Sequence, residues 1–411
     1  MKESRILFFL LAAAIIHSRA VGYCENTPSA LEFVPKHSLV TSKTTDLRKT
    51  GLRVHKPGEC YDGYVLFNNF PAEDAYKKNP EYWVGFTPIY LLSAKGEIAY
   101  RWMAPGPVGF SRIDKTGHLF YLTHPLAAAD GIHELDMNNN EVWDYSLSGC
   151  GRDLRTLDND LFIILNSAKV ASPSAGLPEA SQAPLMVVPH ISIISRDKKT
   201  LWSWQGEKYI PELEKLYGKK IPLFNPGHQD PEDWFHANTC EILRDNPLAE
   251  KDQRFRKGNI IFCSFYLDLM GIIEYPSGKI IWSFGPGVLD GPHSPAMLDN
   301  GNFLILDNGV RRGWSRVIEI DPLKKEIVWE YRADPPGSFF SPFMSNATRL
   351  PNGNTFICDG TKNRLFEITP AGKVVWDMIP MLDGISGYFG ILRVEKYSKE
   401  YLKPILDHKN Q

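Results

Sequence analysis

Several common features are missing from this sequence of 411 residues. The formal net charge is only −2 and no block of lysine and arginine stands out, so charge gives no reason to expect a nucleic-acid partner. The six cysteines include no CxxC pair, which argues against a structural zinc site. No long amphipathic helical pattern separates the strand-like runs, which favours an all-β fold.

The long apolar run at the N-terminus is too short to span a bilayer comfortably. Lys2 and Arg5 precede it, it extends over residues 6–16, and Ser18 and Ala20 supply small residues at the usual cleavage spacing. This pattern predicts a secretory signal peptide and a mature protein that is secreted or periplasmic. A retained signal anchor is the alternative.

The cysteines fit two roles. An oxidising compartment would permit disulfide bonds, whose connectivity the sequence does not define. Cys240, Cys263 and Cys358, however, lie in or beside apolar strand runs, where a cysteine is a small core residue.

Self-similarity with a period of about fifty residues organises most of the chain, as in propellers and arrays. Each repeat has a turn, an apolar strand, an alternating strand, a second turn and a strand that ends at tryptophan. The repeats end at Trp102, Trp143, Trp202 or Trp204, Trp282, Trp329 and Trp376. They predict an all-β fold, a six-bladed β-propeller of four-stranded antiparallel blades around a central channel. We expect the tryptophans to fill the space between neighbouring blades.

The predicted organisation has four parts: a signal peptide (1–20), an N-terminal extension without repeats (21–58), the propeller (59–395) and a C-terminal tail (396–411). Residues 206–235 break the period, contain a short helical pattern and lead directly into His236. We therefore expect this insertion to lie over one mouth of the channel as a lid.

Aligning the repeats on their turns locates the residues that lead into the innermost strands. His293 then corresponds to Ser345 and Arg152, and roughly to His236, with His55 as the least secure match. In a propeller, such positions form a ring around one end of the channel. The structural alternative is that each histidine only caps a strand with a hydrogen bond.

Histidine and arginine together suit the transfer of an anionic group between oxygens. Arg311, which occurs in the fifth repeat only, and Arg152 offer planar forks of donors for sulfate, phosphate or carboxylate oxygens. Histidine acts as a nucleophile or general acid at neutral pH without a metal. The set does not suit calcium, which prefers several carboxylate and carbonyl oxygens.

Several stretches resemble the bacterial arylsulfotransferase family. They are residues 233–238 (DWFHAN), His293 followed by Arg311, residues 349–357 (RLPNGNTFI), and residues 364–369 with 372–376. The resemblance covers roughly residues 60–395. It implies a six-bladed propeller that transfers sulfuryl groups between phenols without PAPS or another nucleotide donor, without a metal and without any other cofactor.

The resemblance also suggests roles for single residues. The predicted catalytic residues are His236, His293 and Arg311, and the predicted substrate-binding residues are Arg152 and Asn238. The nucleophilic histidine of the family would stand near Met344 and Ser345, where this sequence has none. The expected partners are a small aryl sulfate and a phenol, with no nucleic acid and no membrane span after signal cleavage. The sequence leaves open whether the protein forms a homodimer.

A second class of function stays open as well. A non-catalytic propeller would bind an anionic or phenolic ligand in the same channel, or a protein partner on its outer surface. A quinone-dependent dehydrogenase propeller fits less well, because the sequence shows neither the number of repeats nor the metal-binding carboxylates it needs. Asn346-Ala347-Thr348 is a glycosylation sequon, but we expect it at the channel opening.

Overall fold

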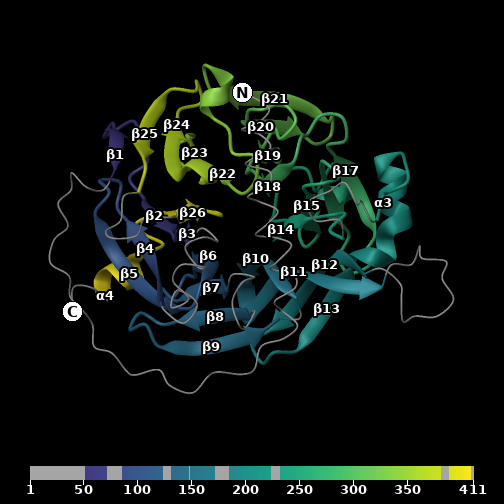
Figure 1. Cartoon of the computed structure of the whole chain (residues 1–411), viewed down its shortest axis with the longest axis horizontal. Helices are drawn as coiled ribbons and strands as arrows, with labels where there is room; N and C mark the ends of the chain where they lie inside the picture. The colour runs from purple at the N-terminus through teal and green to yellow at the C-terminus, as the bar shows by residue number, and fades with distance from the viewer. Residues whose placement is uncertain are drawn as a thin grey trace.

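Six antiparallel sheets stand around one axis in the computed structural model (Figure 1). The structure describes residues 51–71, 86–123, 131–147, 149–171, 185–223, 232–380 and 388–408. The predicted all-β fold, a six-bladed β-propeller, is confirmed. The predicted signal peptide and most of the N-terminal extension lie outside the described residues.

The first three blades have four strands each, which follow one another from the axis outwards. Blade one has β27 (Glu395–Tyr397), β2 (Tyr64–Phe67), β4 (Phe86–Leu92) and β5 (Ile98–Pro105). Blade two has β6 (Val108–Ile113), β7 (Leu119–Thr123), β8 (Gly131–Leu135) and β9 (Glu141–Ser146). Blade three has β10 (Cys150–Thr156), β11 (Leu161–Ala171), β12 (Leu185–Ser195) and β13 (Thr200–Gln205).

The second half of the ring continues the pattern. Blade four has β14 (Ala237–Ile242), β15 (Ile260–Ser264), β16 (Leu269–Ile273) and β17 (Ile280–Phe284). Blade five has β18 (Pro292–Met297), β19 (Phe303–Asp307), β20 (Arg316–Asp321) and β21 (Glu326–Arg332). Blade six has five strands: β22 (Asn346–Arg349), β23 (Thr355–Asp359), β24 (Arg364–Ile368), β25 (Val374–Met378) and β1 (Leu52–His55). A small separate sheet pairs β3 (Phe70–Pro71) with β26 (Tyr388–Gly390).

The Asn-Gly-Asn turns that repeat in the sequence are held by a glutamate in the third strand of the same blade. The side-chain amide of Asn302 donates to Glu319 at 2.7 Å, and that of Asn354 donates to Glu367 at 2.7 Å. The glycine of each turn adopts a positive φ, which glycine tolerates without steric cost. These bonds fix where the second strand begins relative to the first.

Tryptophans on the fourth strand of each blade, counted from the axis, tie that blade to the next. The indole N–H groups of Trp143, Trp204, Trp282, Trp329 and Trp376 each donate to a backbone carbonyl of the following blade, at 2.7–3.1 Å. In blade one the Trp102 N–H has no partner, and the Tyr100 hydroxyl donates to the carbonyl of Met137 instead. The predicted packing of tryptophan between blades is confirmed, since four of them are almost completely buried.

Strands from both ends of the described chain close the ring. β1 adds to the outer edge of blade six, and β27 forms the inner edge of blade one. The predicted propeller limits of 59 and 395 therefore leave out β1 and most of β27. His55, which the repeat alignment grouped with the channel residues, lies on β1 opposite Trp376, at the perimeter.

Arg393, in the segment between β26 and β27, reaches the axis of the ring. Its guanidinium donates to Asp153 of blade three at 2.6 Å and to the carbonyl of Asn238 of blade four at 2.8 Å. It lies 5.0 Å from the ring centre of Phe110 in blade two. The next residue, Val394, exchanges two hydrogen bonds with the side chain of Asn346 in blade six. One short segment thus joins four blades at the axis.

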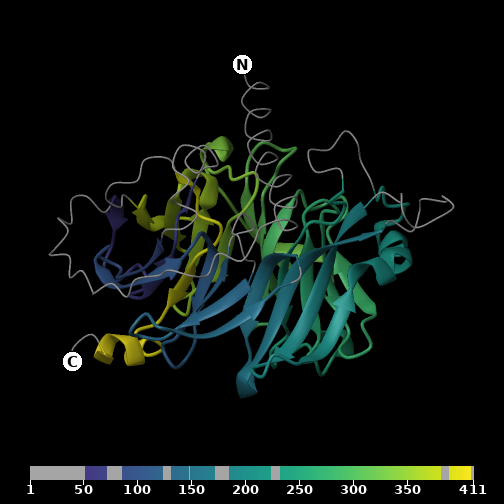
Figure 2. The same ribbon diagram turned by 60° about the horizontal axis from the view of Figure 1, so that its bottom comes forward.

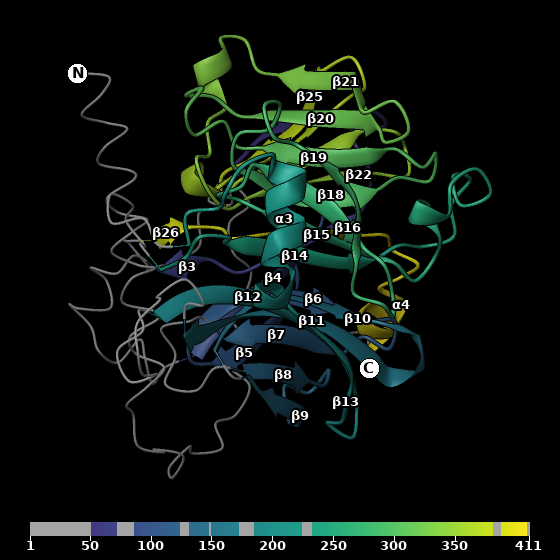
Figure 3. The same cartoon turned by 90° about the vertical axis from the view of Figure 1, so that its right-hand side faces the viewer.

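The two α-helices within the described ranges lie outside the ring. α3 (Ile210–Tyr217) packs beside β17, where Glu212 accepts a hydrogen bond from the backbone N–H of Ile280 at 3.1 Å (Figure 3). The helical part of the predicted lid is therefore at the perimeter, and residues 224–231 of the same insertion lie outside the described residues. α4 (Lys403–His408) packs through Ile405 on the first two blades (Figure 2). No helix within the described ranges has the length and apolar character that a membrane crossing requires.

The five described cysteines are free and buried, so no disulfide joins them. Cys240, Cys263 and Cys358 are core residues, as predicted, while Cys24 lies outside the described residues. The sequon at Asn346 is also buried, and its amide both donates to and accepts from the backbone of Val394. A glycan at Asn346 is therefore incompatible with the folded ring.

Candidate functional site

His236 and His293 come together where the innermost strands of blades four and five begin. His236 directly precedes β14 and His293 lies in β18. The backbone of this region is strained, because φ is +48° at His236, +52° at Ser294, +63° at Met344 and +80° at Ser345. Left-handed conformations are uncommon outside glycine, and such strain gathers at functional sites.

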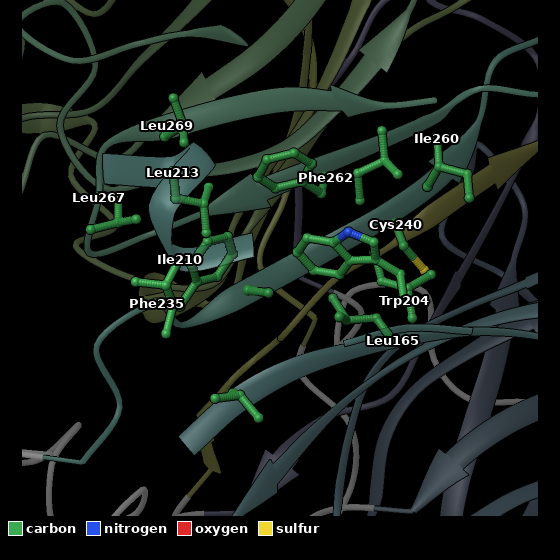
Figure 4. Close-up of a cluster of buried hydrophobic side chains, with 14 of the residues drawn as sticks. Leu165, Trp204, Ile210, Leu213, Phe235, Cys240, Ile260, Phe262, Leu267 and Leu269 are labelled. Atoms are coloured by element: carbon green, nitrogen blue, oxygen red, sulfur yellow. The ribbon is translucent and has the colours of Figure 1, made fainter. Parts of the chain in front are cut away.

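A buried apolar cluster between blades three and four holds the backbone on both sides of the site (Figure 4). Phe235, which precedes His236, and Leu267, which follows Tyr266, are both buried in it. Trp204 of blade three packs in the same cluster. Burying a side chain such as Phe235 is worth roughly 2–3 kcal/mol, so the core fixes the residues next to it.

His236 is supported by a buried carboxylate. Its Nδ1 lies 2.6 Å from Asp233 Oδ2, and its backbone N–H donates to Asp233 Oδ1 at 2.7 Å. Burial opposes ionisation of Asp233, but His236 and Arg152 outweigh it and lower the pKa of the carboxyl to about 2. Because the ionised carboxylate only accepts, His236 donates from Nδ1, and Nε2 is the nitrogen that can exchange a proton with a substrate.

His293 is supported by a neutral amide instead. Its Nδ1 lies 2.8 Å from Asn308 Oδ1, and only 8% of the residue is exposed. Burial lowers the pKa of His293 to about 3, with help from the charges of His236 and Arg393 and against the hydrogen bond with Asn308. His293 is therefore an uncharged imidazole at neutral pH.

One aromatic ring contacts both histidines. The ring centre of Phe265 lies 5.7 Å from that of His236 and 5.4 Å from that of His293. Tyr266 also contacts His236, at 5.1 Å between ring centres. The site thus combines an uncharged imidazole, a second imidazole beside an ionised carboxylate, and an aromatic wall.

The two predicted substrate-binding residues differ in position. Arg152 lies in the site, with a guanidinium nitrogen 3.7 Å from Asp233 and its Nε–H donating to Ser167 at 3.0 Å. Asn238 braces the strands: its amide donates to the carbonyl of Pro292 at 2.9 Å, and its oxygen accepts from the neighbouring Thr239 hydroxyl. The described contacts thus give Asn238 a structural task.

Arg311 lies at the outer side of the site and is paired with two carboxylates. Its guanidinium is 2.7 Å from Asp268 and 3.0 Å from Asp290, and its side chain is 65% exposed. Its backbone N–H also donates to Asp290 at 2.9 Å. Neither aspartate was among the predicted site residues, because both come from separate turns that the sequence does not connect.

A β-bulge in the first strand of blade five changes how that strand aligns with the first strand of blade six. The bulge follows His293, which lies opposite Leu306, and the matching residue of blade six is Asn346, opposite Cys358. Counting back from the turns selects Ser345 instead, because sequence alone does not reveal the extra residue. Neither position supplies an imidazole.

Comparisons with known proteins agree on the fold alone. A protein of unknown function from Bacteroides caccae is similar with a TM-score of 0.49 and 14% identity, over 82% of this chain and 99% of that one. A streptogramin B lyase has a TM-score of 0.43 and 11% identity, over 86% and 100%. A catalytically inactive virginiamycin B lyase variant from Staphylococcus aureus has 0.38 and 13%, over 70% and 83%. No family model and no curated protein matches the sequence.

The described part of the chain holds no group of three or more His, Cys, Asp or Glu residues suited to a metal ion. Asp233, Asn308 and Arg393, which support the histidines or act on them, were not among the predicted site residues. Asp233 was within reach, since it stands three positions before His236 in the same motif. Asn308 and the axial Arg393 carry no comparable signal, because their contacts join distant parts of the chain.

Proposed function

We propose that this protein is an arylsulfotransferase-like enzyme that moves a sulfuryl group from an aryl sulfate to a phenol through His293. The observation that carries this proposal is the pair of unlike histidines, one uncharged and one beside an ionised carboxylate, which share the ring of Phe265. Such a pair divides the tasks of nucleophile and general acid. The choice of sulfuryl among anionic groups rests on the sequence resemblance.

In the first step, the lone pair of His293 Nε2 attacks the sulfur of the aryl sulfate. The bond from sulfur to the aryl oxygen breaks and its electron pair leaves with that oxygen, which takes a proton from His236 Nε2. A phenol departs, and His293 carries the sulfuryl group. An uncharged nucleophile suits this step because a protonated imidazole has no lone pair to offer.

In the second step, the acceptor phenol gives its proton to His236 while its oxygen attacks the sulfur. The bond between sulfur and His293 breaks and returns the electron pair to Nε2. The ionised Asp233 favours the imidazolium that forms on His236. Both histidines then regain their starting states, so the cycle needs no other reactant.

We assign the sulfonate oxygens to Arg152, because it lies next to the Asp233–His236 pair. A guanidinium matches such oxygens with two parallel donors. Arg311 suits this task less well, since Asp268 and Asp290 already neutralise its charge. We also propose secretion, which rests on residues 1–20 alone.

The test is incubation of the mature protein with a chromogenic aryl sulfate, with and without a phenol, while intact mass is recorded. The proposal predicts phenol-dependent release and a sulfate adduct on His293. If neither appears but aryl sulfate raises the melting temperature, the protein is the non-catalytic binder that the sequence left open. The absence of turnover, adduct and protection would contradict both sulfuryl transfer and the binding of an aryl sulfate.

A further inference from the structure

We infer that Asn308 is a positioning residue that holds His293 in the tautomer with the proton on Nδ1 and the lone pair on Nε2. This inference rests on the proposed function, because that tautomer matters only if Nε2 reacts. It also gives blade six, which lacks the histidine that the resemblance predicts, a part in the site.

The hydrogen bonds of Asn308 decide the tautomer. Its Nδ2 donates to the carbonyl of Ser341 at 2.7 Å and to the carbonyl of Met344 at 3.0 Å. Carbonyls only accept, so the amide nitrogen must face them and the oxygen must face His293 at 2.8 Å. An oxygen in that place accepts the Nδ1–H of His293. The uncharged ring then has its lone pair on Nε2.

Rotation of the Asn308 side-chain amide by half a turn would break its three hydrogen bonds, to Ser341, Met344 and His293. Asn308 is completely buried at the end of β19, and its own carbonyl accepts from the hydroxyl of Ser315 at 2.7 Å. A rotated amide would place its oxygen against two carbonyls and its nitrogen against the N–H of His293. Each buried polar group left without a partner is costly, so one orientation is populated.

The carbonyls that hold Asn308 belong to the strained segment of blade six. Met344 and Ser345 both have positive φ, and the Ser345 hydroxyl accepts from the Gly360 N–H at 2.9 Å and pairs with Ser341 at 2.7 Å. The N–H of Ser345 donates to the carbonyl of Leu392. This network keeps the Met344 carbonyl aimed at Asn308, so blade six sets the chemistry of a histidine in blade five.

The direct test is long-range ¹⁵N–¹H NMR of His293 in the full-length mature protein, in wild type, Asn308→Ala and Asn308→Asp. Wild type should show a single uncharged Nδ1–H tautomer at pH 7. Asn308→Ala should lose that preference and lower kcat at least about tenfold with little change in KM. Asn308→Asp should show a protonated His293 at pH 7, with activity recovering as pH rises. His236 and Arg393 are the other titratable groups that act on this ring, and neither changes in these variants.

Asn346→Ala is the matched control, because it also removes a buried amide with two backbone hydrogen bonds but contacts neither histidine. It should lower the melting temperature while leaving the His293 tautomer and the pH profile unchanged. A wild-type spectrum with the proton on Nε2, or an Asn308→Ala variant that keeps the Nδ1–H tautomer, overturns the inference. The spectra need no turnover, so they stay decisive if the protein proves inactive and only the proposed function fails.

Discussion

Blades four and five each bring one histidine to the same end of the ring but support it differently. Behind His236 stands a carboxylate, Asp233, whose pKa lies near 2 despite its burial. Behind His293 stands an amide, Asn308, and burial with neighbouring positive charge lowers the pKa of that imidazole to about 3. The two histidines therefore differ in the group that holds Nδ1, an ionised carboxylate for His236 and a neutral amide for His293.

The difference begins with one residue directly after the second strand of each blade. In blade five this residue is Asn308, which can accept from His293. In blade four it is Phe265, which has no hydrogen-bonding side chain. The preceding loop supplies Asp233 instead. One substitution between repeats thus separates an uncharged imidazole from one that faces a formal negative charge.

The largest expected effect is on turnover, when either the nucleophile His293 or the general acid His236 is replaced. His293→Gln should lower turnover of an aryl sulfate by about 10³-fold or more and remove the sulfate adduct, because the nucleophile is lost. His236→Gln should lower turnover by about 10²-fold, since a general acid contributes 10²–10⁴-fold, and should still allow slow adduct formation. Initial rates and intact mass measure both. Equal losses with the adduct retained in His293→Gln would contradict the assignment.

The second expected effect is on stability between about pH 6.5 and 3. The pKa of His293 is about 3 in the folded protein and 6.5 when unfolded, so the unfolded chain binds the extra proton in this range. Stability is fully present above pH 6.5 and falls by up to about 4 kcal/mol as pH drops towards 3. The free energy of unfolding, measured with urea at several pH values, should depend less steeply on pH in His293→Gln than in wild type. A slope equal to that of wild type would mean that His293 is charged in the fold.

The third effect concerns the carboxylate behind His236, in a lower pH range. The folded pKa of Asp233 is depressed, so its contribution is present above about pH 4 and is lost as pH falls towards 2. Asp233→Asn should therefore reduce the free energy of unfolding at pH 7 by about 2 kcal/mol, and the deficit should shrink as the medium is acidified. Asp144→Asn, which removes an exposed partner of Lys198, is the control and should match wild type. A deficit independent of pH would show that the ion pair is not its cause.

The smallest expected effect is on KM, and it distinguishes the two arginines near the histidines. Arg152→Gln should raise KM for an aryl sulfate about tenfold, as expected when a charge-assisted hydrogen bond is lost. Arg311→Gln should change KM less than about threefold, because Asp268 and Asp290 hold that guanidinium already. Melting curves check that both variants fold. A larger increase in KM for Arg311→Gln than for Arg152→Gln would mean that Arg311 binds the sulfonate.

The fold was accessible from sequence because every blade repeats the same local rules. The closing tryptophan recurs in every blade, and the turn asparagines with the glutamate that binds them recur in blades five and six. The site was accessible only in part. His236 and His293 were predicted together and do lie together, because the strand starts of neighbouring blades meet at one end of a propeller.

The other contacts of the site join residues from different repeats, so the repeat period does not predict them. The partners of Arg311 come from turns in front of β16 and β18. The bulge after His293 inserts a residue that shifts the match with blade six. Arg393 reaches the axis from outside the repeats, so its pairing with Asp153 was invisible to a comparison of repeats.

The axial segment also sets an order of events during synthesis. A ribosome releases β1 early, yet its partner strand β25 emerges only after five blades have been made. Arg393 and β27 follow later still, so until then Asp153 lacks its nearest positive partner and blade one lacks its inner strand. A nascent chain that stops before Arg393 would hold nearly all of the blades and still fail to lock them. Synthesis of Arg393 and β27 is thereby the step that closes the ring.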